Sequence, residues 1–243
     1  MSQWEELKAN LGKIEERIGY TFQKKDLLMA AFTHSSYVNE TKAKGIADSE
    51  RLEFLGDSIL GLLIAEYLFQ RLPEEPEGQL SQLRSQIVDA TSCAKYLNTL
   101  GFSELILLSR GERIHAGQGK MSIQADTFEA IIGALYLDGG LEEVRTFLFA
   151  YFKEMIEEEI KNPTVNYKAE LQDFSQKYYR KTPTYEVAKV VGPEHAKIFH
   201  VVVFLNEKEV GRGMGRSKKE AEQAAASDAL SKRAEFSKES PTS

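Results

Sequence analysis

Three acidic residues recur at helical spacing in the segment 49–60, which reads SERLEFLGDSIL. Because an α-helix turns by about 100° per residue, Glu50, Glu53 and Asp57 lie within roughly 60° of one another on its surface. The other faces of this predicted helix are apolar, which indicates that neighbouring elements cover it. A carboxylate in such a setting is costly unless it pairs with a cation or binds a metal ion. This acidic stripe is therefore the first candidate for a chemical site.

A second segment has the same character, because Asp126 and Glu129 share one face of a predicted helix that is rich in isoleucine. These acids can pair with bases such as Arg51 and Arg84 or face water. From the residues alone, that interpretation and a metal site remain equally open. An all-carboxylate group prefers hard cations, Mg²⁺ or Mn²⁺ rather than zinc. The chemistry that would match is metal-assisted attack of water on a phosphodiester.

Apolar residues at intervals of three and four predict helices throughout the first 160 residues. The first predicted helix shows this period at Trp4, Leu7, Leu11, Ile14 and Ile18. Further helical patterns cover 26–31, 50–71, 79–100, 122–137 and 141–161. This part lacks the sustained alternation of polar and apolar residues that marks a half-buried strand. We expect residues 1–160 to form an all-α N-terminal domain.

The pattern changes after a helix stop and short linker at residues 161–166. A helical stretch, three β-branched stretches and a final helix follow, at 167–179, 184–191, 197–205, 209–214 and 217–233. Ser217 and Glu220 have the spacing of a capping box at the start of that final helix. We expect a small α+β domain of order α-β-β-β-α over residues 167–236, and a disordered tail over 237–243.

Charge is divided unevenly between these two parts. Residues 1–163 hold 17 basic and 26 acidic residues, whereas residues 164–243 hold 14 basic and 11 acidic ones. This asymmetry favours two domains with different tasks. The single cysteine, Cys93, fits a reducing compartment and is interpreted as a small buried residue. With neither a signal peptide nor an apolar run of membrane-spanning length in sight, we expect a soluble, cytoplasmic protein without a membrane partner.

The nine residues from Glu50 to Ser58 resemble the signature helix of the ribonuclease III family. Four further segments support this resemblance in the same order along the chain: 33–37 (THSSY), 77–78 (EG), 111–112 (GE) and 125–130 (ADTFEA). The resemblance implies four metal-binding carboxylates, which are Glu53, Asp57, Asp126 and Glu129. Of these, Asp57 and Glu129 match the most critical catalytic positions, and Glu50 and Glu77 match supporting acids.

The same resemblance implies Mg²⁺-dependent hydrolysis of double-stranded RNA, with Mn²⁺ as a possible substitute and no organic cofactor. The expected products carry 5′-phosphate and 3′-hydroxyl ends with a short 3′ overhang, and whether one or two metal ions act stays open. The resemblance also implies a homodimer in which two signature helices pack together and two sites cut opposite strands. Leu52, Phe54 and Leu55 fit such a covered surface, although core packing within one chain explains them equally well.

Residues 167–236 resemble a double-stranded RNA-binding domain over nearly their whole length, in the segments 168–172, 183–185, 192–195, 211–213 and 217–225. Duplex RNA hides its bases in a deep, narrow groove, so such a domain reads shape, phosphates and 2′-hydroxyls. Lys218 and Lys219 combine their charge with the positive end of a helix dipole. The remaining implied contacts are Gln172, Gln176 and His195. Ala169 stands where family members often carry a longer polar group, which puts one contact in doubt.

Together these features predict an endoribonuclease that cuts double-stranded RNA. The resemblance implies that it processes ribosomal, messenger and transfer RNA precursors. One alternative is a non-cleaving regulator that binds duplex RNA, which a cleavage assay would separate from the enzyme. A helical phosphohydrolase of small nucleotides is disfavoured by the RNA-binding module. His34 stands beside Ser35, but adjacent residues do not form a catalytic triad, and we interpret His34 as a packing residue.

Overall fold

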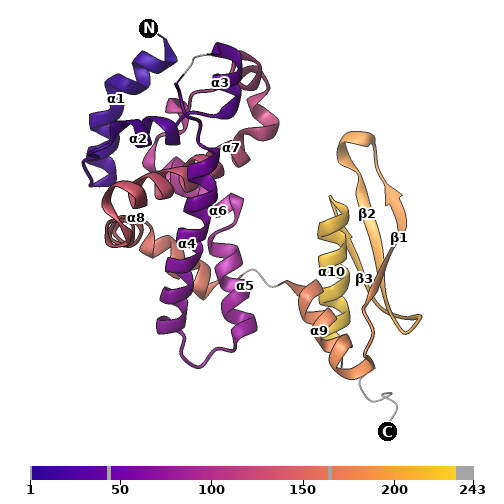
Figure 1. Cartoon of the computed structure of the whole chain (residues 1–243). Coiled ribbons are helices and arrows are strands. Elements are labelled where there is room, and N and C mark those ends of the chain that lie inside the picture. Colours follow the sequence, from indigo (N-terminus) through magenta and orange to yellow (C-terminus); the bar gives the residue numbers. More distant parts are fainter. Residues whose placement is uncertain (1, 43–44, 164–165, 234–243) are drawn as a thin grey trace. The chain divides into compact units, whose positions relative to one another are not determined.

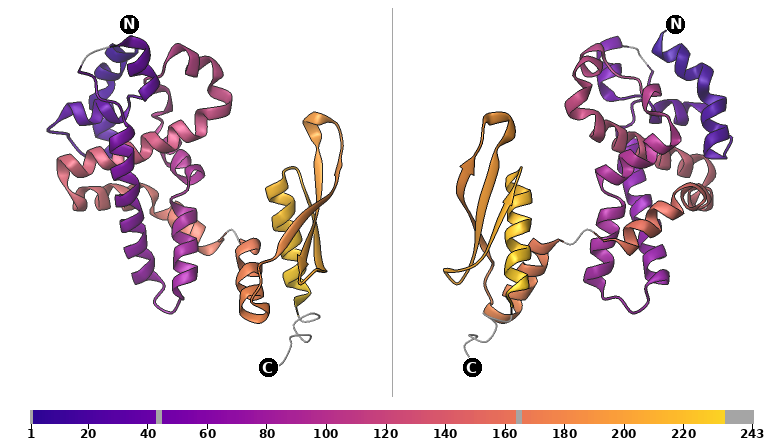
Figure 2. Two further views of the ribbon diagram at one scale, coloured as in Figure 1. Left: turned by 45° about the vertical axis from the view of Figure 1, so that its right-hand side comes forward. Right: turned by 180° about the vertical axis from the view of Figure 1, so that it is seen from behind.

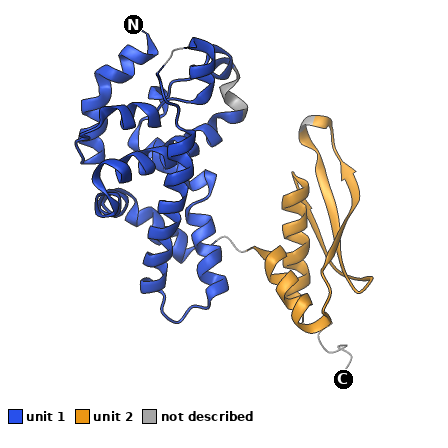
Figure 3. Ribbon diagram, in the orientation of Figure 1, with its two compact units in different colours: residues 1–163 blue, residues 164–243 orange. Residues whose placement is uncertain are grey.

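The computed structural model describes residues 2–42, 45–163 and 166–233, apart from the side chains of residues 115–118 and 195. The chain forms two compact units, residues 1–163 and 164–243 (Figure 3). The predicted tail at 237–243 and residues 164–165 of the predicted linker lie outside the described residues. Over the described part, no helix has the length and apolar character needed to cross a membrane.

The first unit is helical, which confirms the predicted fold class. Its α-helices are α1 (Gln3–Ile18), α2 (Lys25–Ala31), α3 (Ser35–Thr41), α4 (Glu50–Arg71), α5 (Glu77–Ile87), α6 (Ala90–Leu100), α7 (Arg110–Gly139) and α8 (Leu141–Lys161). A 3-10 turn, η1 (Ser103–Leu105), separates α6 from α7.

Two helix boundaries differ from the sequence prediction. The single helical pattern predicted over 79–100 is two helices, because Asp89 accepts a hydrogen bond from the Ser92 amide at 2.8 Å and caps the start of α6. Helix α7 begins well before residue 122, where Ser109 caps it by accepting from the Glu112 amide at 3.1 Å. The short helix α3 was absent from the prediction.

Helices α4 and α7 cross at the centre of this unit (Figures 1 and 2). Next to the crossing, the buried aromatic rings of Tyr96, Phe128 and Phe152 pack with centroid separations of 4.8 to 5.4 Å. These rings join α6, α7 and α8 into one hydrophobic core. Leu60 and Leu63 of α4 belong to the same core, which therefore holds the two acid-bearing helices together.

Glycines allow α4 and α7 to approach at backbone distance. A methyl group at Gly56 would lie 1.8 Å from the Glu129 carbonyl oxygen, and one at Gly133 would lie 2.2 Å from the Leu52 carbonyl oxygen. Both distances are far inside van der Waals contact, so the two glycines face each other's helix without room for a side chain. Glycine in a helix interior costs about 1 kcal/mol relative to alanine. Here that cost is offset by the close approach of the two helices.

The second unit is a three-stranded antiparallel sheet with two helices. Its elements are α9 (Tyr167–Tyr179), β1 (Thr184–Val191), the turn η2 (Glu194–Ala196), β2 (Ile198–Leu205), β3 (Lys208–Gly215) and α10 (Lys218–Ser231), with strand order β1-β2-β3. This order confirms the predicted α-β-β-β-α domain. The capping box is also present, since Ser217 accepts from the Glu220 amide at 3.1 Å.

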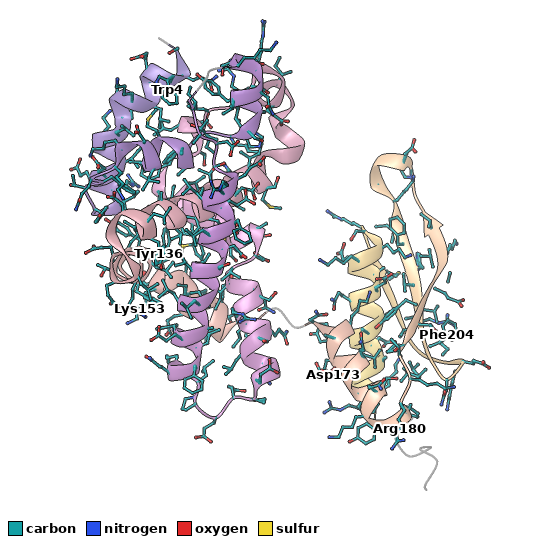
Figure 4. All side chains as sticks on the ribbon, viewed as in Figure 1. Trp4, Tyr136, Lys153, Asp173, Arg180 and Phe204 are labelled. Atoms are coloured by element: carbon teal, nitrogen blue, oxygen red, sulfur yellow. The ribbon has the colours of Figure 1, made fainter. Side chains whose placement is uncertain are left out.

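Small residues bring α10 close to the sheet. The buried Ala221, Ala225 and Ala229 of α10 lie against glycines of β3, where a methyl group at Gly213 would meet the Ala225 amide nitrogen at 2.1 Å. The buried valines of β2 complete this core. Side chains such as Asp173 on α9 and Phe204 on β2 are labelled in Figure 4. The two helices lie on one face of the sheet (Figure 2).

Candidate active site

The crossing of α4 and α7 brings together four predicted carboxylates, Glu53, Asp57, Asp126 and Glu129, which we call the acidic cluster. Glu53 and Asp57 flank Gly56 on α4, and the Glu129 backbone lies directly against Gly56. Glu53, Asp126 and Glu129 are half-buried, whereas Asp57 is exposed. Two acids from each helix thus lie around one contact point, with one edge open to solvent.

The acids of this cluster interact electrostatically. Burial, together with the neighbouring charges of Asp57, Asp126 and Glu53, raises the pKa of Glu129 to about 7. Burial also raises the pKa of Glu53, with the charges of Asp126, Glu50 and Asp57 adding to the effect. Glu53 and Glu129 are therefore harder to ionise, because they are partly buried and other carboxylates lie close to them.

Asp126 differs from the other two because a nearby ring opposes the effect of burial. Burial raises the pKa of Asp126, while the imidazole of His34 lowers it. His34 ends the loop before α3 and is half-buried. The prediction of a packing histidine missed this proximity to the acidic cluster.

In the described part of the chain, lysine and arginine side chains do not neutralise the acidic cluster. Within the described residues, none of the four carboxylates forms an ion pair with a lysine or arginine, and Arg51 and Arg84 are exposed. Across the same residues, no three acidic, histidine or cysteine side chains converge at the spacing of a formed metal site. The donor set is nevertheless made of carboxylate oxygens that share one negative environment, which suits a hard divalent cation.

The two predicted supporting acids occupy different places. Glu50 begins α4 one turn before Glu53, is exposed, and raises the pKa of Glu53 through its charge. Glu77 begins α5 beyond the far end of α4, and its carboxylate accepts a hydrogen bond from the Ser81 hydroxyl at 3.0 Å. Figure 1 shows α4 and α5 as a hairpin, so Glu77 lies at the opposite end of α4 from Glu50. Within one copy of the chain the fold does not bring Glu77 to the acidic cluster.

Cys93 on α6 contacts the acidic cluster from the buried side. It is a free, buried cysteine, as expected, whose thiol donates to the Val88 carbonyl at 3.6 Å. Its proximity to Glu129 lowers the pKa of that carboxyl. Burial and the charge of Glu129 in turn raise the pKa of the Cys93 thiol. The sequence offered no signal for this contact, because Cys93 and Glu129 lie on different helices that are far apart along the chain.

The predicted RNA contacts of the second unit lie on two exposed helix faces. Gln172 and Gln176 are exposed on α9, one turn apart. Lys218 and Lys219 are exposed in the first turn of α10. The pairing of Val191 with Ile198 and of Phe199 with Gly215 places the start of α10 at the end of the sheet where β1 and β2 are connected.

His195 belongs to η2, within that connection, but its side chain lies outside the described residues. Ala169 lies in the first turn of α9, where its amide donates to the capping Asn166 side chain at 3.2 Å. Its methyl group offers no polar contact.

A row of exposed apolar side chains runs along α4. Phe54 is 78% exposed, Leu62 55% and Phe69 73%. At 100° per residue these three lie on one side of the helix. Leu52 is buried and Leu55 half-buried in this unit, so core packing explains those two but not Phe54.

Comparison with known proteins gives the same two-part division. A family model described as Ribonuclease-III-like matches residues 24–156, and one described as Double-stranded RNA binding motif matches residues 167–233. Ribonuclease 3 of Protochlamydia amoebophila (strain UWE25) is 52% identical over 219 residues, which are 90% of each chain. Ribonuclease 3 of Geobacillus thermodenitrificans (strain NG80-2) is 45% identical over 93% of this chain and 92% of its own.

A solved structure of the ribonuclease III nuclease domain from Campylobacter jejuni is also similar, with a TM-score of 0.54 and 40% identity. It covers 60% of this chain and 97% of its own, and is described as showing structural flexibility in a region involved in dimer formation.

Proposed function

Because this chain belongs to the ribonuclease III family, and is a double-strand-specific endoribonuclease on the strength of its two matched domains, we propose that the acidic cluster is its active site. The observation that carries this proposal is the gathering of four carboxylates, without lysine or arginine partners in the described residues, at the crossing of α4 and α7. Asp57 and Glu129 are the proposed catalytic residues, and all four acids are proposed metal ligands.

Mg²⁺ fits this donor set, and Mn²⁺ can substitute for it, since both prefer oxygen ligands. When bound, the cation activates water for attack on the phosphodiester and offsets negative charge in the transition state. Glu53, Asp57, Asp126 and Glu129 would hold it, and Glu50 would add negative charge from the preceding turn of α4. No organic cofactor is proposed.

The residues of the chain prepare the site for this chemistry. Glu129 is half-buried near Cys93, and the charges of Asp57, Asp126 and Glu53 act on its carboxylate. Exposed Asp57 lies at the open edge, where an RNA backbone can reach it. Cleavage there leaves a 5′-phosphate and a 3′-hydroxyl in the proposed reaction.

The exposed apolar row Phe54, Leu62 and Phe69 supports a homodimer. Apolar side chains so exposed along one helix mark an interaction surface. In a two-fold symmetric pair the same surface of each subunit meets its copy. Two acidic clusters on opposite sides of the symmetry axis would then cut opposite strands of one duplex, which leaves a short 3′ overhang.

A homodimer of this kind would also bring Glu77 near an acidic cluster. If α4 packs antiparallel on the α4 of a second copy, the far end of one helix approaches the amino-terminal end of the other. Glu77 follows that far end, so it would support the acidic cluster of the other subunit rather than its own. This explains how a predicted supporting acid can lie far from the acidic cluster within one subunit.

The second unit is proposed to hold the RNA. Gln172 and Gln176 would reach 2′-hydroxyls in one minor groove, and the connection that carries His195 would reach the next. Lys218 and Lys219 would bind the phosphates between them, aided by the helix dipole of α10. We place the activity in the cytoplasm, on duplex regions of ribosomal, messenger and transfer RNA precursors.

Incubation of the purified chain with a long RNA duplex, in Mg²⁺ and in EDTA, tests this proposal. We expect fragments only with the divalent cation, with 5′-phosphates and short 3′ overhangs. Single-stranded RNA of the same sequence is the matched control and should stay intact. Tight binding of the duplex without cleavage in Mg²⁺ or Mn²⁺ would contradict the proposal and indicate a non-cleaving regulator.

A further inference from the structure

The first turn of α9 is hydrogen bonded to a side chain of α10. The Lys168 amide donates to the Gln223 Oε1 atom at 3.2 Å. The Gln223 Nε2 group donates to the Asn166 Oδ1 atom at 2.8 Å, and that oxygen also accepts from the Ala169 amide at 3.2 Å. The first N–H groups of a helix have no partner within the helix. Gln223 therefore satisfies one of these groups of α9 and also holds the residue that caps this helix.

An ion pair joins the same two helices beside these hydrogen bonds. The Lys168 Nζ atom lies 2.6 Å from the Glu222 Oε2 atom, and only 14% of the Glu222 side chain is exposed. The same ammonium group lies over the Tyr185 ring of β1, 4.8 Å from its centroid. A charge-assisted hydrogen bond that is shielded from water holds its partners more firmly than an exposed ion pair does. Two neighbouring residues of α10 thus fix the position of the first turn of α9.

The residues that join the helices lie one helical turn from the predicted RNA contacts. Gln172 follows Lys168 by four residues on α9, and residues four apart share a helix face. Lys218 and Lys219 precede the two joining residues of α10 by the same interval. Gln172 and the two lysines are exposed. The joint between the helices therefore sets the spacing between the groove contacts of α9 and the phosphate contacts of α10.

We propose that Gln223 and Lys168 are positioning residues that hold this spacing at a value that favours duplex RNA over duplex DNA. This inference rests on the proposed RNA-binding function of the second unit. A-form RNA has a wide minor groove and a narrow major groove, whereas the major groove of B-form DNA is wide. The separation between a minor groove and the neighbouring phosphates consequently differs between the two duplexes. Gln223 acts on RNA binding through the placement of α9.

Gln223→Ala tests this inference, because it removes both hydrogen bonds that Gln223 makes and retains a residue that favours a helix. Binding of the full chain to duplex RNA and to duplex DNA of the same sequence is measured in EDTA by fluorescence anisotropy. RNA binding should weaken about tenfold, which lies within the range for coupled residues. DNA binding should change by less than about twofold, since it depends mainly on charge. Ser227→Ala, one turn further along α10, is the matched control and should bind both duplexes like the unmodified chain.

A double-mutant cycle separates positioning from a simple loss of stability. Gln172→Ala should weaken RNA binding of the unmodified chain about fivefold, as expected for one hydrogen bond, but that of Gln223→Ala by less than about twofold. Additive losses, equal weakening of RNA and DNA binding, or unchanged RNA binding by Gln223→Ala would each overturn the inference. If neither Gln172→Ala nor Lys218→Ala with Lys219→Ala weakens RNA binding, the proposed function of the second unit fails instead.

Discussion

Replacing Gly56 by alanine inserts a methyl group where α4 and α7 touch. The added carbon would lie 1.8 Å from the Glu129 carbonyl oxygen and 2.6 Å from its carbonyl carbon. Both are backbone atoms within a helix, so neither can rotate away. Restoring ordinary contact, near 3.4 Å, requires the helices to separate by about 1.5 Å at this point. Overpacking of this kind costs about 3 kcal/mol, the upper end of the usual range.

The same separation moves Asp126 and Glu129 away from the acids of α4. Misplacement of catalytic groups by about 1 Å can lower a rate by roughly 100-fold. We therefore expect Gly56→Ala to lower the melting temperature of the helical unit by about 5 to 10 °C. At 25 °C, where the variant remains folded, duplex cleavage should fall by about 100-fold at saturating RNA. Binding of RNA through the second unit should change little.

The assay pairs thermal unfolding with single-turnover cleavage of a duplex RNA. Gly12→Ala is the matched control, because Gly12 lies exposed in the interior of α1 and its added methyl meets no atom within 4 Å. That variant should gain up to about 1 kcal/mol from helix propensity and cleave normally. If Gly56→Ala unfolds and cleaves like the unmodified chain, the close crossing does not position the site and the reasoning is refuted.

Three further predictions address charge, RNA binding and assembly. The raised pKa of Glu129, about 7 against an ordinary 4.5, means that its contribution to stability is most favourable below pH 4.5 and is lost as pH rises toward 7. In urea unfolding, metal-free Glu129→Gln should thus be more stable than the unmodified chain by about 1 kcal/mol at pH 8, after allowance for solvent screening. At pH 4.5 the two proteins should be equally stable. The same difference in unfolding free energy at both pH values would contradict this expectation. Lys218→Ala with Lys219→Ala should weaken duplex RNA binding and reduce the salt-dependence slope by about 2, and an unchanged slope would exclude their contact with phosphates. Phe54→Ser should shift the chain toward monomer in sedimentation at micromolar concentration. Ile114→Ser, at a similarly exposed position on α7, should leave the oligomeric state unchanged. If both variants sediment alike, the exposed side chains of α4 do not form the dimer interface.

The sequence predicted the fold well where local signals and periodicity coincide. Helical spacing located α4 and α8 with their correct bounds, and the capping pair Ser217 and Glu220 located the start of α10. The sequence prediction merged α5 and α6 into one helix, because the apolar period continues across their junction. The break depends on one side-chain hydrogen bond to a backbone amide, which periodicity does not encode.

The acidic cluster also shows that contacts between distant segments cannot be predicted from local sequence patterns. Spacing placed the acids in pairs on two helices, but the distance between the pairs depends on Gly56 and Gly133, more than 70 residues apart along the chain. A glycine inside an apolar helix was the available signal, since its propensity cost requires a packing reason. Glu77 could not be placed from the sequence, because its location depends on where the α4–α5 hairpin ends. The proximity of His34 to Asp126 could not be predicted from the sequence, because Asp126 approaches from another helix.

Glu129→Gln tests the central claim most directly, because it removes one carboxylate charge and keeps the shape of the side chain. Cleavage and binding of the same duplex RNA are measured side by side in Mg²⁺. If the acidic cluster cuts and the second unit holds the RNA, cleavage is abolished while affinity remains within about twofold. Cleavage at the rate of the unmodified chain, or an equal loss of cleavage and binding, would contradict this account.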